Sequence, residues 1–316
     1  MSEPVIKPLV LLGATAVGKT RMALELAALV PQIEIISADS RQIYRQMNLG
    51  TAKPTAAELA QVRHYFIDIK EPDESYNAGE YGQQARLKCR ELLQQGKIPL
   101  IVGGSGLYLH SLADGLFQGE ASDPELKEFL QQRVDQEGLE VLYRELQYHD
   151  PEAAHKIHPN DRQRVVRALE VWYVTGETVS KLRKILRPKT SVQAIWIGLD
   201  MSRQILYRRI EDRVDDMIRQ GLFAEIKNLR QLGYSRNLQS QKTVGYQEIH
   251  AVCDGEITLT DAVIKIKCNT RRFAKRQMTW FKHDPRIRWF EVETVGQWLI
   301  ARQFLTEQLQ SLQWAS

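Results

Sequence analysis

A glycine-rich turn between an apolar run and a helical pattern is the strongest constraint on how this chain folds. The run Val5–Leu12 is largely apolar and rich in branched side chains, which predicts a buried strand. The turn 13-GATAVGKT-20 follows with the spacing G-x-x-x-x-G-K-[ST], and Gly18–Leu29 then has the pattern of a helix. A strand that passes through such a turn into a helix is the context in which this motif binds phosphate.

The residue types of this turn suit phosphate groups. Its glycines allow backbone N–H groups to point inward at phosphate oxygens, and the N-terminus of the helix adds the positive end of its dipole. Lys19 adds a point charge, and the Thr20 hydroxyl can reach a magnesium ion. The motif therefore predicts bound phosphates and Mg²⁺. It leaves open whether a nucleoside triphosphate, the usual ligand, or another molecule carries the phosphates.

Further apolar segments predict a parallel sheet around this loop. The apolar composition of buried strands is found in Ile33–Ser37, Lys97–Val102 and Gln193–Leu199. Helical patterns separate the strands before residue 103. An alternation of strands and helices is typical of a parallel sheet with helices on both faces. The predicted class is α/β, with a P-loop NTPase-like core.

The stretch 122–188 differs because it carries only helical patterns. Asp123 and Asp150 are each followed by a proline and a glutamate, which is the signature of a capped helix start. Asn160 is a candidate cap for a third helix in this stretch. The stretch is therefore expected to be an all-helical insertion.

These patterns give a division of the chain. The P-loop-type core is predicted to comprise residues 1–120 and 192–316, and the helical insertion residues 121–191. Within the second part of the core, helices are expected over Arg203–Leu232 and Thr260–Lys282.

Asp39 is the candidate acid at the carboxyl edge of the sheet. Ordinary phosphate-loop NTPases place an aspartate at the end of another apolar strand to help hold magnesium, but here 98-IPLIVGGSG-106 ends in glycines and Ser105. Ligands of open parallel sheets bind beyond the carboxyl ends of the strands, so Asp39 is expected over the same crevice as the loop. Asp39 is a candidate magnesium ligand, a candidate base, or a helix cap. Ser105 is either a partner of an acceptor or an ordinary turn residue.

Positive charge is concentrated in a few segments. The net charge is only +4, so the chain as a whole does not coat nucleic acid. Residues 265–288 nevertheless hold nine Lys or Arg against one acid, with Phe273, Trp280 and Phe281 interleaved. Basic side chains neutralise phosphates and aromatic rings stack on unpaired bases. A solvated helix face with its aromatics in the core would have the same composition.

Two further segments add polar or basic groups. In 160-NDRQRVVRALEVW-172 the helical period places Gln163, Arg167 and Glu170 on one face, opposite the apolar residues. The segment 242-KTVGYQE-248 places a lysine, a glycine turn and a tyrosine in an expected loop. Basic surfaces on the core and on the insertion indicate a folded polyanion as the partner, and RNA fits that pattern better than a small metabolite.

Other features point to an intracellular enzyme or binding protein. No apolar run approaches the roughly 20 residues needed to span a bilayer, and the N-terminus lacks a signal-type segment. Cys89, Cys253 and Cys268 are far apart and form no CxxC pair, which favours structural thiols over a disulfide framework or a zinc site. We therefore expect a cytoplasmic protein that does not bind membranes.

An ordered set of segments resembles the bacterial tRNA dimethylallyltransferases, also called tRNA isopentenyltransferases, over almost the full length. The segments are 13-GATAVGKT-20, 36-ISADSRQIY-44, 50-GTAKP-54, 102-VGGSGLY-108, 157-IHPNDRQRVVRALE-170, 242-KTVGYQE-248 and 270-TRRFAKRQMTWF-281. The phosphate loop alone would be unspecific, whereas the ordered set is specific.

The resemblance implies the activity. Its members transfer a dimethylallyl group from dimethylallyl diphosphate to N6 of the adenosine 3′-adjacent to the anticodon (position 37), in tRNAs that read codons beginning with U, and magnesium assists. The phosphate loop would then hold the diphosphate of a lipid precursor rather than a nucleotide. The implied partner is the anticodon stem-loop, and we expect a monomer.

The resemblance also implies roles for individual positions. Asp39 matches the general base on the adenine amine, Ser105 a hydroxyl residue near the target nucleotide, and Arg213 a support for the leaving diphosphate. The implied diphosphate site comprises Gly13, Thr15, Ala16, Val17, Gly18, Lys19 and Thr20, of which Thr20 also binds Mg²⁺. The implied tRNA contacts are Asp39, Ser40, Arg41, Gln42, Ser105, Asp123, Gln163, Arg164, Val165, Val166, Arg167, Lys242, Thr243, Val244, Gly245, Tyr246 and Gln247.

Three other functions are compatible with a phosphate loop. A small-molecule kinase would use Asp39 as the acceptor's base, but it would not need the basic segments. A relative that prenylates free adenine nucleotides would not need the segment 157–170. A non-catalytic RNA-binding NTPase switch would bind nucleotide without transferring a prenyl group.

Overall fold

The computed structural model describes residues 7–115, 123–185 and 192–313. Contacts divide the chain into two compact units. Met1–Ala113 and Ser191–Ser316 form the first, called the core unit here, and Asp114–Thr190 form the second, called the helical unit.

The core unit is built on a six-stranded sheet in the order β3-β2-β4-β1-β5-β6, and every strand pair is parallel. The strands are β1 (Leu9–Gly13), β2 (Ile33–Ala38), β3 (His64–Tyr65), β4 (Ile98–Gly103), β5 (Ile195–Asp200) and β6 (Arg288–Glu291). This confirms the predicted α/β class with a parallel sheet. Sequence patterns did not identify β3, which has two residues, or β6, whose side chains are all at least partly exposed.

Strand β1 lies at the centre of the core. It pairs with β4 on one side and β5 on the other, and its residues are all buried. Burial on both faces explains why β1 is a continuous apolar run instead of an alternating pattern. The phosphate loop begins at the carboxyl end of this central strand.

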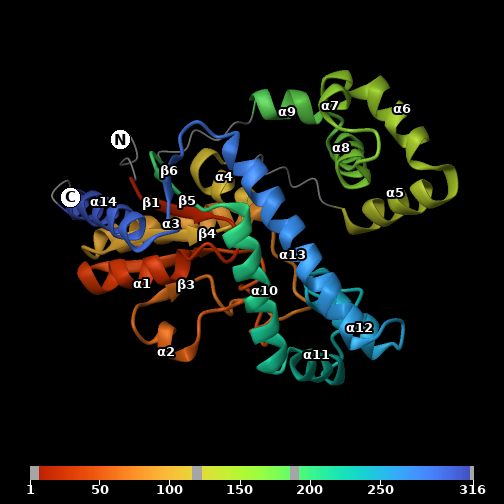
Figure 1. Ribbon diagram of the computed structural model, residues 1–316. Coiled ribbons are helices and arrows are strands. Elements are labelled where there is room, and N and C mark those ends of the chain that lie inside the picture. The colour runs from red at the N-terminus through yellow and green to blue at the C-terminus, as the bar shows by residue number, and fades with distance from the viewer. Residues whose placement is uncertain (1–6, 116–122, 186–191, 314–316) are drawn as a thin grey trace. The chain divides into compact units, whose positions relative to one another are not determined.

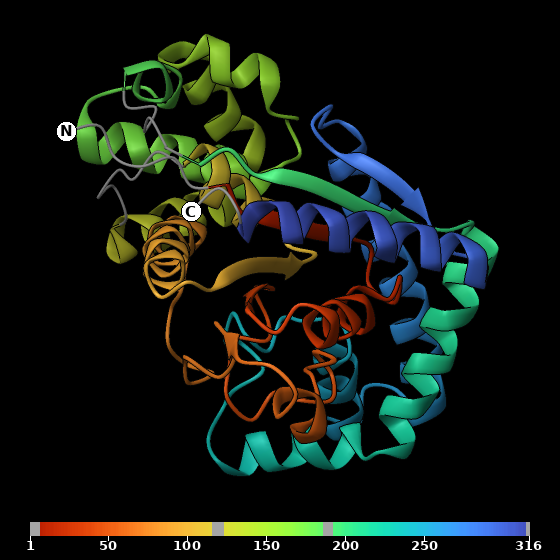
Figure 2. The same cartoon turned by 90° about the vertical axis from the view of Figure 1, so that its left-hand side faces the viewer.

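Helices cover the sheet and enclose a second core. The helices of this unit are α1 (Lys19–Leu29), α2 (Ala56–Leu59), α3 (Ala78–Gln94), α4 (Gly106–Asp114), α10 (Arg203–Arg219), α11 (Leu222–Gln231), α12 (Tyr246–Cys253), α13 (Leu259–Lys282) and α14 (Val295–Gln313). Helices α1 and α14 lie side by side against the sheet (Figures 1 and 2) and share one apolar cluster with it. Helices α10 to α13 enclose another cluster together with Ile43, Tyr44 and Met47. None of the described helices is long and apolar enough to cross a membrane.

The helical unit consists, within its described residues, of helices around their own apolar cluster. They are α5 (Pro124–Glu137), α6 (Leu139–His149), α7 (Pro151–Lys156), α8 (Arg162–Thr175) and α9 (Val179–Ile185). The predicted caps Asp123 and Asp150 are confirmed, since their carboxylates accept backbone N–H groups of the first turn of α5 and α7. The predicted cap Asn160 is wrong. Asp161 caps α8 instead, because its carboxylate accepts the Arg164 N–H at 3.1 Å.

We predict that Asp150→Ala destabilises the helical unit by about 2–3 kcal/mol in urea denaturation followed by circular dichroism. Asp150 is buried, and one carboxylate oxygen accepts the Ala153 N–H at 3.0 Å while the other accepts the Ser180 N–H at 2.9 Å. The substitution leaves both donors without their partner. The matched variant Asp161→Ala removes a cap that is more exposed than Asp150, and it should cost about 1 kcal/mol. Equal losses for the two variants would contradict this account.

Candidate functional site

The phosphate loop folds around the ammonium group of Lys19. The Lys19 Nζ donates to the carbonyl oxygens of Gly13 at 3.0 Å and Ala14 at 2.8 Å. Burial and, to a smaller extent, the positive charge of Arg213 lower the pKa of Lys19 to about 8, while Asp39 acts in the opposite direction. Three groups from different parts of the chain therefore act on one another electrostatically at this loop.

Arg213 brings a second cation from α10. Its Nη1 lies 3.5 Å from the Thr15 hydroxyl oxygen, and burial lowers the pKa of its guanidinium, helped by the positive charge of Arg209. Enclosing two cations together is unfavourable unless an anion accompanies them. The loop and Arg213 thus form an anion site, as the motif predicts.

Asp39 lies just past the carboxyl end of β2. Its Oδ1 accepts the backbone N–H groups of Arg41 at 2.8 Å and Gln42 at 3.4 Å, which closes a turn. The residues after Asp39 form turns and not a helix, so the cap interpretation of Asp39 is wrong. Both bonds use the same oxygen, and no hydrogen bond to Oδ2 occurs within the described residues. The carboxylate can therefore accept a further proton donor.

Ser105 joins this turn to the end of β4. Its hydroxyl oxygen accepts the Ser40 N–H at 3.0 Å and lies 3.3 Å from the Ser40 hydroxyl, while its own N–H donates to the Ala38 carbonyl at 3.1 Å. The carboxyl ends of β2 and β4 are therefore tied together beside Asp39. Asp39, Ser40 and Ser105, which the sequence analysis placed in one site, do lie together.

Gln277 on α13 is a site residue that sequence reasoning missed. Its Oε1 accepts the Thr15 N–H at 2.9 Å, and its Nε2 donates to the Gly104 carbonyl at 2.9 Å. A Cβ at Gly104 would lie 2.4 Å from the Gln277 Nε2, so this close approach requires glycine. The side-chain amide thus bridges the phosphate loop and the turn that carries Ser105. A polar residue on the buried face of an amphipathic helix was the signal that could have identified it.

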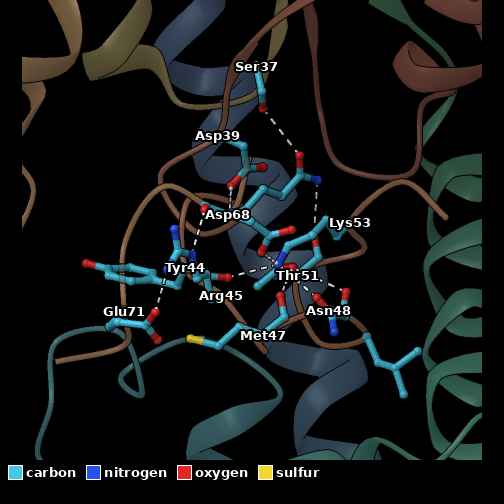
Figure 3. Close-up of polar contacts among 12 residues, drawn as sticks. Ser37, Asp39, Tyr44, Arg45, Met47, Asn48, Thr51, Lys53, Asp68 and Glu71 are labelled. Atoms are coloured by element: carbon cyan, nitrogen blue, oxygen red, sulfur yellow. Dashed lines mark hydrogen bonds and ion pairs between the residues drawn. The ribbon is translucent and has the colours of Figure 1, made fainter. Parts of the chain in front are cut away.

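A buried lysine organises the segment after the Asp39 turn (Figure 3). The side chain of Lys53 is 4% exposed, and its Nζ donates to the Tyr44 carbonyl, the Asn48 side chain and the Asp68 carboxylate at 2.5–2.8 Å. Gln42 also bonds to this segment, donating from Nε2 to the Thr51 carbonyl at 3.3 Å. Lys53 was not a candidate from the sequence. Its contacts give it a structural role within 50-GTAKP-54, one of the segments that carry the family resemblance.

The candidate RNA contacts in the helical unit fall into two groups. Gln163, Arg164 and Arg167 are exposed on α8, whereas Val165 and Val166 are buried in the cluster of this unit. Glu170 was expected beside Arg167 on the exposed face, but it is 2% exposed and pairs with Arg167 at 2.8 Å. Asp123 is exposed and also caps α5. Any contact made by the two valines must use their backbone.

The candidate RNA contacts in the segment 242–247 also include both exposed and buried residues. Lys242 and Gln247 are exposed, while Thr243 and Val244 are partly exposed. Gly245 and Tyr246 are buried, and the Tyr246 hydroxyl donates to Glu225 at 2.6 Å. Tyr246 is the first residue of α12 and does not lie in a loop as expected. Because its side chain is buried, RNA contact at this position also requires the backbone.

Helix α13 presents basic and aromatic side chains to solvent. Some of its cations are paired: Lys267 with Asp215, Arg271 with Glu211 and Lys282 with Asp200. Arg272, Lys275 and Arg276 are exposed, and the side chains of Phe273 and Trp280 are 41% and 47% exposed. The alternative that these two rings pack in the core is therefore wrong, although it holds for Phe281.

The donor atoms present fit magnesium held mainly through a substrate. No group of three or more His, Cys, Asp or Glu side chains with metal-site spacing occurs in the described part of the chain. Magnesium usually keeps several waters and binds through one or two protein oxygens plus phosphates. Thr20, a partly exposed residue at the start of α1, is the candidate for such an oxygen.

Comparisons with known proteins show the family to which this chain is similar. The family model for IPP transferase matches residues 42–284. The chain is 44% identical over 294 residues to the tRNA dimethylallyltransferase of Bacillus subtilis, covering 92% of this chain and 91% of that protein. It is 43% identical over 297 residues to the tRNA dimethylallyltransferase of Natranaerobius thermophilus, covering 92% and 89%.

Solved structures give the same family. The full-length tRNA isopentenylpyrophosphate transferase of Bacillus halodurans matches with a TM-score of 0.71 and 37% identity, covering 97% of each chain. A eukaryotic dimethylallyltransferase acting on tRNA matches with a TM-score of 0.77 and 27% identity, covering 92% of this chain and 75% of that one. The chain therefore belongs to the IPP transferase family, in which these tRNA dimethylallyltransferases also fall.

Proposed function

We propose that this chain is a tRNA dimethylallyltransferase. It transfers the dimethylallyl group of dimethylallyl diphosphate to N6 of the adenosine 3′-adjacent to the anticodon, in tRNAs that read codons beginning with U. The observation that carries the proposal is the junction at the carboxyl edge of the sheet. There, an anion site with two cations is hydrogen-bonded through Gln277 to the turn that carries Ser105 beside Asp39.

The acceptor chemistry requires a group such as Asp39. The adenine amine is a weak nucleophile because its lone pair is delocalised into the ring. As N6 attacks the allylic carbon, the C–N bond forms, the C–O bond to diphosphate breaks, and one N6 proton must leave. The Asp39 carboxylate orients the amine and takes that proton through its Oδ2. Ser105 holds the Asp39 turn through Ser40.

The leaving group requires positive charge. Diphosphate gains negative charge as the C–O bond breaks, and the loop amides, Lys19 and Arg213 neutralise it. Both cations are already enclosed at the loop, so little reorganisation is needed at the moment of reaction. Magnesium bound to the diphosphate and to the Thr20 hydroxyl would supply further charge neutralisation.

The RNA is held by exposed groups of both units. Gln163, Arg164 and Arg167 serve this role in the helical unit, and Lys242, Gln247 and the partly exposed Arg41 in the core unit. A target base next to an anticodon must leave its stack at a cost of a few kcal/mol, which contacts to the stem-loop offset. The expected state is a monomer in the cytoplasm.

The proposal is tested by transfer of radiolabelled dimethylallyl from its diphosphate, without ATP. The acceptors are an anticodon stem-loop with adenosine 3′ of the anticodon, the same stem-loop with guanosine there, and free AMP. Label on the adenosine stem-loop alone is the expected result.

The other outcomes contradict the proposal in different ways. Label on AMP would make the chain a free-nucleotide prenyltransferase. Label on no acceptor, with an active control enzyme, would favour a small-molecule kinase or an RNA-binding NTPase switch. Both would bind nucleotide, and only the kinase would transfer its phosphate to a small molecule.

We predict that Asp39→Asn lowers kcat for transfer by at least about 100-fold while the Kd values for tRNA and pyrophosphate change little. The amide keeps an oxygen that can accept the turn N–H groups but cannot take the N6 proton. Asp39→Ala should lose most transfer as well. Asp212→Asn, at an exposed position on α10, is the control and should retain activity. Full activity of Asp39→Asn would remove Asp39 as the base.

We predict that pyrophosphate binding weakens as pH rises through about 8, the pKa to which burial lowers Lys19. Lys19 is protonated below this pH and neutral above it, so the charge that attracts the anion is present at low pH and lost at high pH. Calorimetric titrations from pH 7 to 9.5 should show the fall. In Lys19→Arg the fall should be absent because guanidinium stays protonated. A Kd independent of pH in the wild type would contradict the assignment.

We predict that Gln277→Met lowers kcat by about tenfold and costs about 1–3 kcal/mol of stability. Methionine keeps the volume but leaves the Thr15 N–H and the Gly104 carbonyl without partners. Thr279→Val on the same helix touches neither loop and serves as the control. Wild-type kcat in Gln277→Met would show that the bridge is dispensable.

A further inference from the structure

Trp298 on α14 contacts the phosphate loop from outside the anion site. Its side chain is largely buried, at 7% exposed. It lies beyond residues 42–284, the span that the family model matches, and sequence analysis gave it no role. The motif that defines the loop is therefore supported by a residue some 280 positions away along the chain.

The contact is with Gly18, the last glycine of the loop. Gly18 has φ +112°, a conformation that glycine adopts readily and other residues rarely do. A Cβ placed there would lie 3.0 Å from Cζ3 and 3.2 Å from Cη2 of Trp298. The indole edge therefore lies directly against the backbone that begins α1.

The indole is fixed in this position by polar contacts. Its Nε1 donates to the Glu25 carboxylate at 2.8 Å, and Arg302 donates to the same oxygen at 3.3 Å. Arg21 bonds to the other Glu25 oxygen at 2.9 Å and places its guanidinium 4.7 Å from the indole ring. Contacts from α1 and α14 thus determine where the ring lies.

Arg209 completes the enclosure of Gly18. Its Nη2 would lie 3.7 Å from a Cβ at Gly18, and its Nη1 lies 3.4 Å from the Val17 carbonyl oxygen. The loop backbone at Gly18 therefore has Trp298 and Arg209 as neighbours. Both contacts reduce the freedom of a residue that otherwise has the widest choice of conformation.

We propose that Trp298 is a positioning residue for the diphosphate subsite. It holds Gly18 in its left-handed conformation, so that Lys19 and the N–H groups at the start of α1 face the anion before it binds. A loop that is already ordered before the anion binds loses less conformational entropy on binding, so its affinity for the anion is higher. This inference rests on the proposed function, because the anion is taken to be the diphosphate of the prenyl donor.

The test compares Trp298→Ala and Trp298→Phe with Leu305→Ala. Leu305 is a fully buried residue of the same helix and cluster, and it is not among the neighbours that a Cβ at Gly18 would meet. Calorimetry gives the Kd for inorganic pyrophosphate, and steady-state assays give KM for dimethylallyl diphosphate and for the stem-loop. Thermal melts show how far each variant loses stability.

We expect Trp298→Ala to raise the pyrophosphate Kd and the donor KM by about tenfold, with the stem-loop KM unchanged. Trp298→Phe keeps a ring against Gly18 but loses the bond to Glu25, and it should fall between wild type and Trp298→Ala. Leu305→Ala should lose comparable stability and keep the wild-type Kd.

Two results would overturn the inference. One is a wild-type pyrophosphate Kd in Trp298→Ala, and the other is an equal rise in Kd for Leu305→Ala, which would show a general effect of core damage. Failure of the proposed function is distinct from these, because the wild type itself would then fail to transfer dimethylallyl to the stem-loop.

Discussion

The site depends on positive charge enclosed at the carboxyl end of β1. Lys19 and Arg213 lie near each other, and each has a pKa lowered mainly by burial and also by a neighbouring cation. A protein gains nothing in stability from such an arrangement on its own. Binding a compact anion removes the repulsion between the two cations, so in the proposed reaction these charges would favour the diphosphate and the transition state in which it leaves.

The fold brings the proposed acceptor residues, which are distant in sequence from the phosphate loop, close to this positive charge. Parallel strands β1, β2 and β4 end at one edge, which places the phosphate loop, the Asp39 turn and the Ser105 turn together. Hydrogen bonds then set their spacing: Ser105 holds the Asp39 turn, and Gln277 holds the phosphate loop against the segment preceding Ser105. In the proposed reaction, the sheet edge and helix α13 would therefore set the geometry between donor and acceptor.

Local patterns predicted the parts of this structure that depend on local physics. The phosphate loop, the central strands and the capped helices of the insertion follow from motif, periodicity and capping chemistry. The helical pattern could mark Gln277 as a buried polar residue but could not identify its partners, because they are 262 and 173 residues distant in sequence. Likewise, the burial of Tyr246 depends on its contact with Glu225 from another helix. Asp161 replaced Asn160 as a cap because the exact start of a helix depends on one turn of backbone geometry.

We propose that the phosphate loop holds a prenyl diphosphate and not a nucleotide. Calorimetric titration with a non-transferring thio analogue of dimethylallyl diphosphate, in the presence and absence of ATP, tests it most directly. The account predicts one analogue bound per chain, displaced by inorganic pyrophosphate and lost in Lys19→Met, with ATP binding more weakly than the analogue. Tight ATP binding by a protein that does not bind the analogue would contradict it.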